Sequence, residues 1–173
     1  GILLQVQNKT FEYLKELDGH EIASEKINEI SLFLKEQLNI VLNKDFFKFK
    51  LNNQVIKLKE ILDKPIRVCG MVKNEGEPGG GPFWVKGSDG RLTLQIVETS
   101  QIDLKNGEQL KILENATHFN PVDLVCGLKN YKNQKFDLKQ FVDPESGFIV
   151  YKNHAGVDIK SYELPGLWNG AMA

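Results

Sequence analysis

A glycine-rich loop is the first segment whose residue types could do chemistry. From Cys69 to Glu98 the sequence reads CGMVKNEGEPGGGPFWVKGSDGRLTLQIVE, in which the loop separates two apolar runs. Glycine runs cost backbone entropy, so they usually mark a place where something approaches the backbone closely. The neighbouring charged side chains offer donors and acceptors to a polyhydroxylated ligand such as a sugar. The candidate ligand-binding residues are Lys73, Glu75, Glu77, Gly79, Gly80 and Gly81.

The residues after the glycines exclude two well-known phosphate-binding loops. A Walker A loop continues into Gly-Lys-Ser/Thr, and a dinucleotide fingerprint also opens a helix. Here Phe83 and Trp84 open a strand instead. The alternative to a ligand site is a wide connection between two strands, softened by glycine. The ligand hypothesis predicts that the loop lines a pocket close to Glu98.

A second polar group follows the strand that ends in LQIVETSQID. Glu98 closes this apolar run, and Ser100 and Asp103 come shortly after it. Polar side chains at the exit of a buried strand are a common way to build a ligand site on a rigid support. Helix capping is the alternative for Ser100 and Asp103. Capping explains Glu98 less well, because a carboxylate at the end of an apolar strand needs a partner.

The remaining polar candidates lie near the end of the chain. His118 and Asn120 stand just before the apolar run that begins at Pro121, and Asn169 follows Trp168. A lone loop histidine is more often structural than catalytic, and an Asn-Pro pair also shapes turns. Trp168 fits a packing role, whereas Asn169 is a further candidate for binding. No Cys-x-x-Cys or His-x-x-His spacing occurs, so we expect no metal site in this chain.

The composition is that of one globular domain. The chain has 173 residues, 41% apolar and 26% charged, with 22 basic against 23 acidic side chains. This balance argues against a nucleic-acid partner, and no apolar run reaches the ~20 residues that span a bilayer. We expect a cytoplasmic protein in which Cys69 and Cys126 are reduced and buried. The apolar start and the dense final segment are typical of a fragment of a longer protein.

The periodicity changes from helical to strand-like near residue 65. We expect an α/β fold, with α+β as the alternative. In this fold a helical segment (1–64) packs on a mixed-sheet, sugar-binding-like part (65–173) within one structural domain. The predicted helices are 2–17, 24–42, 53–62 and 106–115. The predicted strands are 66–73, 83–87, 92–98, 121–128, 147–152 and 157–163, with hairpins at 84–96 and 148–162.

Four segments carry a resemblance to a known family. They read RVCGMVKNEGEPGGGPFWV, LQIVETSQID, THFNPVDLVCGLKNYK and ELPGLWNGAMA. Together they resemble the bacterial domain-of-unknown-function family 4301 (DUF4301). This resemblance places the chain in the C-terminal part of the family's longer proteins. That family in turn resembles nucleotide-diphospho-sugar transferases.

A weaker resemblance to sugar-1-phosphate nucleotidyltransferases implies roles for single residues. Glu98 matches a glutamate that binds sugar hydroxyls, Ser100 a small polar residue after it, and Asn120 a sugar-contacting asparagine. Lys73 is the local candidate for a phosphate contact. The sequence departs from those enzymes in the insertion EGEPGGGP and in Thr99, which replaces an aromatic residue.

The resemblance implies that this chain is the sugar-phosphate-binding part of a sugar nucleotidyltransferase, with the C-terminal half of that fold. A missing N-terminal half would supply the nucleotide loop and the acid that holds Mg²⁺. The isolated chain would therefore bind no metal and be inactive. The expected partners are a sugar phosphate or nucleotide sugar and the missing half, with no nucleic acid or membrane. The alternative is a non-catalytic carbohydrate-binding or protein-assembly module.

Overall fold

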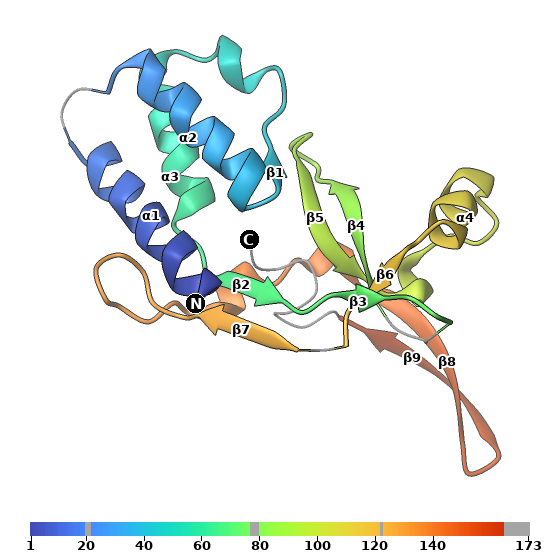
Figure 1. Cartoon of the computed structure of the whole chain (residues 1–173). Helices are drawn as coiled ribbons and strands as arrows, with labels where there is room; N and C mark the ends of the chain where they lie inside the picture. The colour runs from blue at the N-terminus through green and yellow to red at the C-terminus, as the bar shows by residue number, and fades with distance from the viewer. Residues whose placement is uncertain (20–21, 77–79, 122, 165–173) are drawn as a thin grey trace.

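A helical segment at one end and several small sheets at the other make up the chain (Figure 1). The computed structural model describes residues 1–19, 22–76, 80–121 and 123–164. The helical segment contains α1 (Ile2–Leu17), α2 (Ser24–Gln37), the short 3₁₀ turn η1 (Phe46–Lys48) and α3 (Leu51–Leu62). The predicted helix 2–17 is confirmed residue for residue.

The second helix is shorter than predicted because the chain turns sharply at Asn39. This residue has a φ of 53°, a left-handed conformation that asparagine tolerates better than most residues. Helix α2 ends at Gln37 rather than at 42. Ile40 and Val41 then form the two-residue strand β1, which pairs with a strand of the sheet part. The helical segment is thereby joined to a sheet by main-chain hydrogen bonds.

The main core of the described residues belongs to the helical segment. Its members come from the apolar faces of the three helices and from the connection between α2 and α3. Tyr13 packs edge-on against Phe33, with ring centroids 5.1 Å apart. The buried members are Tyr13, Leu14, Leu17, Ile27, Ile30, Leu34, Ile40, Phe46, Leu58, Ile61 and Leu62. Burial of these side chains is the dominant stabilising contribution that this part of the chain offers.

The sheets are small, and every pairing among the described strands is antiparallel. One sheet has the order β1–β5–β4, with β4 at Gly81–Lys86 and β5 at Leu92–Val97. The others pair β2 (Ile66–Cys69) with β7 (Leu124–Gly127), β3 (Val72–Lys73) with β6 (His118–Phe119), and β8 (Phe148–His154) with β9 (Val157–Glu163). The expected mixed sheet is therefore wrong for the described strands. The chain is mixed in helix and strand content, in the sense of the α+β alternative.

The predicted strand 66–73 is broken at Gly70. The Gly70 N–H donates to the Asp123 carbonyl at 2.8 Å, and a Cβ on Gly70 would lie 3.2 Å from the Asp123 Cβ. Beyond this break the chain changes partner, because β2 pairs with β7 whereas β3 pairs with β6. The single apolar run 66–73 thus contributes one strand to each of two sheets.

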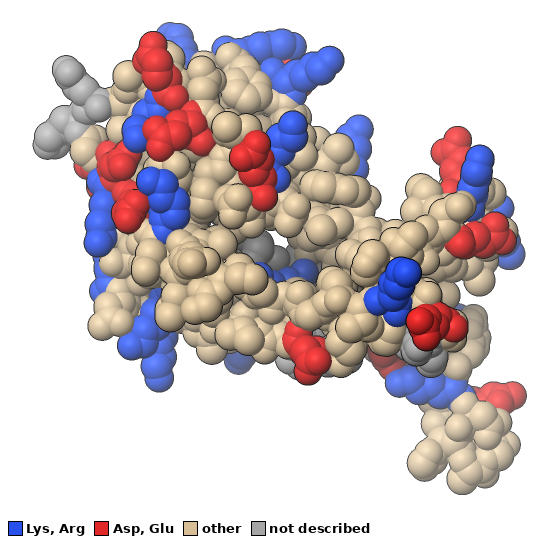
Figure 2. Space-filling model, in the orientation of Figure 1, with Lys and Arg blue, Asp and Glu red and all other residues tan. Residues whose placement is uncertain are grey.

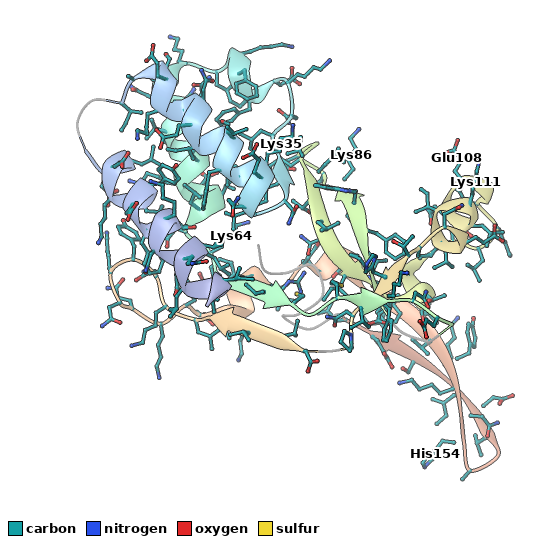
Figure 3. The ribbon with its side chains drawn as sticks, viewed as in Figure 1. Lys35, Lys64, Lys86, Glu108, Lys111 and His154 are labelled. Carbon is teal, nitrogen blue, oxygen red and sulfur yellow. The ribbon has the colours of Figure 1, made fainter. Side chains whose placement is uncertain are left out.

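Both predicted hairpins are present, and the second projects from the body. Strands β4 and β5 pair from Gly81 to Val97, close to the predicted bounds. The β8–β9 hairpin extends away from the other elements in Figure 1, and His154 lies at its tip in Figure 3. The short helices η2 (Thr99–Gln101), α4 (Gly107–Glu114), η3 (Leu138–Phe141) and η4 (Pro144–Ser146) complete the described part.

Cys69 and Cys126 lie on the paired strands β2 and β7. Both are free thiols, as expected, but both are only partly buried rather than fully buried. Their side chains share one sheet face, because Cys126 is directly opposite Arg67 and Arg67 precedes Cys69 by two residues. Within the described part of the chain, none of the helices combines the length and apolar character needed to cross a membrane.

Candidate functional site

Four of the candidate residues lie next to one another, and we call them the glycine cluster: Gly80, Gly81, Glu98 and Asn120. The Asn120 N–H donates to the Gly80 carbonyl at 2.8 Å. A Cβ on Gly80 would lie 2.9 Å from Glu98 Oε1, and one on Gly81 would lie 3.2 Å from the His118 carbonyl oxygen. Both glycines are buried. They are required here for the close approach of protein groups, whereas the sequence hypothesis had a ligand approach the glycines.

Glu98 has a local role that its sequence context did not predict. It is the N-cap of η2, where it forms a capping box with Gln101, and its backbone N–H donates to Gln101 Oε1 at 2.9 Å. A capping box satisfies the free N–H groups at the start of a helix. Capping therefore applies to Glu98 itself, whereas it had been considered only for the residues after it. Ser100 lies exposed within η2.

Asn120 links Gly70 and Gly80 through hydrogen bonds to both of their carbonyl groups. Only 7% of its surface is exposed, and its Nδ2 donates to the Gly70 carbonyl at 2.7 Å while its main chain holds Gly80. These bonds join the break after β2 to the start of β4. This geometry fits a positioning role, and a sugar contact by Asn120 stays a prediction.

The other candidates lie apart from this cluster or outside the described residues. Lys73 is exposed on β3, opposite His118, and Glu75 is exposed in the loop that follows. Thr117 Oγ1 and His118 Nδ1 are 2.8 Å apart, which gives the histidine a local partner. Glu77, Gly79 and Asn169 lie outside the described residues.

A large groove lies on the β4–β5 hairpin, and we call it the sheet groove. Its volume is about 800 Å³, within the range of ligand pockets. Its walls come from the end of α3, both strands of the hairpin, η2, α4 and η4. Figure 2 shows the surface hollowed where the helical segment meets the sheets. The polar side chains that line the groove include Lys64, Arg91, Thr93, Gln95, Gln101 and Gln109.

The lining of the sheet groove includes no member of the glycine cluster. Phe83 is paired with Gln95, and both line the groove. None of the described loop residues from 74 to 76, nor Gly80, lines this groove. The two regions are still linked, because Gln101 both lines the groove and accepts the Glu98 N–H.

Lys64 supplies the groove with a cation that forms no ion pair with a described residue. It lies between α3 and β2, and Figure 3 shows it near the lower end of the helical segment, above β2. Burial, followed by the Arg91 guanidinium, lowers the pKa of Lys64 below its ordinary value. Arg91 is itself paired with Asp89, whereas Lys64 forms no ion pair with any described residue. Nothing in the sequence pointed to Lys64 beyond its place before Pro65.

The described residues contain no group of three or more His, Cys, Asp or Glu side chains that could hold a metal ion. The polar side chains of the sheet groove are cations, amides, hydroxyls and two carboxylates, Asp89 and Asp143, of which Asp89 is paired with Arg91. The cations, amides and hydroxyls of this set can hydrogen-bond to anions and to hydroxyl groups.

Comparison with known protein families gives one match. The sequence model of a family described as Domain of unknown function (DUF4301) matches residues 1–173. The chain belongs to the DUF4301 family. No curated protein and no solved structure matches it. The family resemblance expected from the glycine-loop segments is confirmed, and the family description names no activity for this DUF4301 chain.

Proposed function

We propose that this DUF4301 chain binds a phosphorylated sugar in the sheet groove, as the sugar-phosphate-binding part of a sugar nucleotidyltransferase. The observation that carries the proposal is Lys64, a partly desolvated cation that lines the groove without an ion-pair partner among the described residues. A cation that has lost part of its hydration is stabilised by an anion, and a phosphate group is such an anion.

The rest of the groove fits the body of a sugar. Thr93 and Gln101 offer hydroxyl and amide groups, which can both donate to and accept from sugar hydroxyls. Phe83 and Ile102 add the apolar surface typical of small-molecule sites. The glycine cluster adjoins the groove through Gln101 and holds the start of β4 in place.

The enzymatic part of the proposal places nucleotide handling outside this chain. Nucleotidyl transfer requires phosphate-cradling groups and carboxylates that hold Mg²⁺. In this scheme they come from another part of a longer protein, and the present chain holds the sugar phosphate. The same groove would also serve a non-catalytic carbohydrate-binding module, which needs no such addition.

Glucose 1-phosphate is expected to bind the chain in isothermal titration, more tightly than glucose. Lys64→Gln should weaken the binding of the phosphorylated sugar about 10-fold, since it removes a charge-assisted contact. The matched control is Lys35→Gln, an exposed lysine on α2 that does not line the groove. Equal affinity for glucose 1-phosphate and glucose, or equal losses in the two variants, would contradict the proposal.

The isolated chain is expected to release no pyrophosphate from a nucleoside triphosphate and glucose 1-phosphate, even where glucose 1-phosphate binds. The assay is a coupled pyrophosphate measurement on the 173-residue chain with Mg²⁺. Turnover by this chain alone would show that the division of roles is wrong. Release of pyrophosphate only by a longer family protein that contains this region would favour the enzyme over the binding module.

A further inference from the structure

Arg67 is a basic side chain whose hydrogen bonding is incomplete. It lies on β2, and its Nη2 donates to Gln95 Oε1 at 2.7 Å. Its Nη1 is buried and makes no hydrogen bond within the described part of the structure. A guanidinium normally forms paired hydrogen bonds with a carboxylate or a phosphate. Among the described residues, Arg67 hydrogen-bonds to one neutral amide through Nη2 and to no group through Nη1.

The surroundings of Arg67 offer no compensating negative charge among the described groups that act on it. Burial is the main effect on its pKa, which is lowered, and the other contributors are the thiols of Cys69 and Cys126. Burial also raises the pKa of Cys69, so this thiol is uncharged at neutral pH. A desolvated cation without a counter-charge is costly to keep in a folded protein.

Gln95 connects Arg67 to the sheet groove. Gln95 lines the groove next to Phe83, and its amide oxygen accepts a hydrogen bond from Arg67 Nη2. The glutamine contacts Arg67 with a neutral acceptor, which a charged acceptor can replace with a stronger bond. Rotation of the Gln95 side chain would open Arg67 to a ligand in the groove.

We propose that Arg67 is the phosphoryl-binding residue of the sheet groove and that Gln95 is a cap which the phosphoryl group displaces. The inference rests on the proposed function, because it names the contact of the same ligand. Lys64 then acts as a second cation toward the turn of the hairpin, where Arg91 and Asp89 lie. Lys64 lines the groove itself, whereas Arg67 lies behind Gln95 and becomes accessible when Gln95 is displaced.

Three variants test the cap. Gln95→Glu places a carboxylate on Arg67 in nearly the same shape, so it should weaken glucose 1-phosphate binding by about 10-fold or more in isothermal titration. It should also raise the thermal unfolding midpoint of the unliganded protein, because the buried cation gains a counter-charge. Gln95→Ala removes the cap and should leave binding equal or tighter. Arg67→Gln should abolish the preference for glucose 1-phosphate over glucose.

The matched control is Gln109→Glu. Gln109 lines the same groove from α4, and its Oε1 accepts the Asp103 N–H at 2.8 Å, a bond that glutamate keeps. This variant adds the same charge without reaching Arg67, so its loss of affinity should stay below about 3-fold. Inorganic phosphate and a nucleotide sugar, titrated in parallel, separate a single phosphoryl group from a diphosphate.

The outcomes separate this inference from the proposed function. If glucose 1-phosphate binds the unmodified chain but Gln95→Glu and Gln109→Glu weaken its binding equally, Arg67 is not the phosphoryl contact. The proposal that the sheet groove binds the sugar phosphate would still stand. A lower thermal unfolding midpoint for Gln95→Glu would likewise contradict the proposal that Gln95 covers the guanidinium of Arg67. If neither glucose 1-phosphate nor inorganic phosphate binds the unmodified chain, the proposed function fails and this inference fails with it.

Discussion

Replacing Leu34 with Ala is expected to lower the free energy of unfolding by about 3 kcal/mol, as deletions of fully buried leucine side chains commonly do. Leu34 lies on the inner face of α2 with 0% of its surface exposed, and it belongs to the core cluster of the helical segment. The loss combines the transfer of the deleted atoms with the cavity that they leave. Urea unfolding followed by circular dichroism measures it.

Leu32 provides a matched control on the same helix. It is the same residue type two positions earlier, and 53% of its surface is exposed. Leu32→Ala should change the free energy of unfolding by less than about 0.5 kcal/mol. Equal losses for the two variants would mean that α2 does not bury the face described above.

Replacing Gly80 with Ala is expected to destabilise the chain by about 1–2 kcal/mol, in the range of overpacking substitutions. The new methyl group would lie 2.8 Å from the Ile96 Cγ2 and 2.9 Å from Glu98 Oε1. Ile96 is buried, so it has little room to give way. The movement should also disturb the N-cap of η2, because the Glu98 carboxylate is one of the displaced groups. Thermal unfolding reports the loss of stability.

The control for this substitution is Gly107→Ala. Gly107 is the first residue of α4, and nothing lies within 4 Å of the position of its Cβ. Alanine there should be neutral or stabilising by up to about 1 kcal/mol, because it reduces the freedom of the unfolded chain. A Gly80→Ala variant as stable as Gly107→Ala would contradict the close packing of the glycine cluster.

Sequence periodicity predicted the long elements well. Helix α1 and strand β9 have the expected bounds, and both hairpins form, because each element is long enough to show its period or is marked by turn residues. The two-residue strands β1, β3 and β6 have no period to detect. Their pairing depends on which distant segments meet.

The candidate site was harder to predict because spacing does not show which face a side chain takes. Gly80 and Glu98 are brought together by tight packing, which glycine permits, whereas the pocket expected at the loop stays a prediction. Lys64, which lines the groove, and Arg67, which contacts Gln95, were not predicted, because each is a single basic residue beside an apolar run. They are candidates because they are partly buried and their charges lack an ion-pair partner among the described residues, which depends on the tertiary structure.

The pairing of β2 with β7 has a consequence for the order of folding. Ile66 pairs with Gly127, so this ladder closes a long loop, whereas α1, α2 and α3 are neighbours along the chain. Loop closure costs entropy before the distant contact repays it, so local contacts form faster. The helical segment is therefore the natural nucleus, and the sheets that carry the groove assemble on it later. Until that step, the edges of β2 remain open to pairing with other chains.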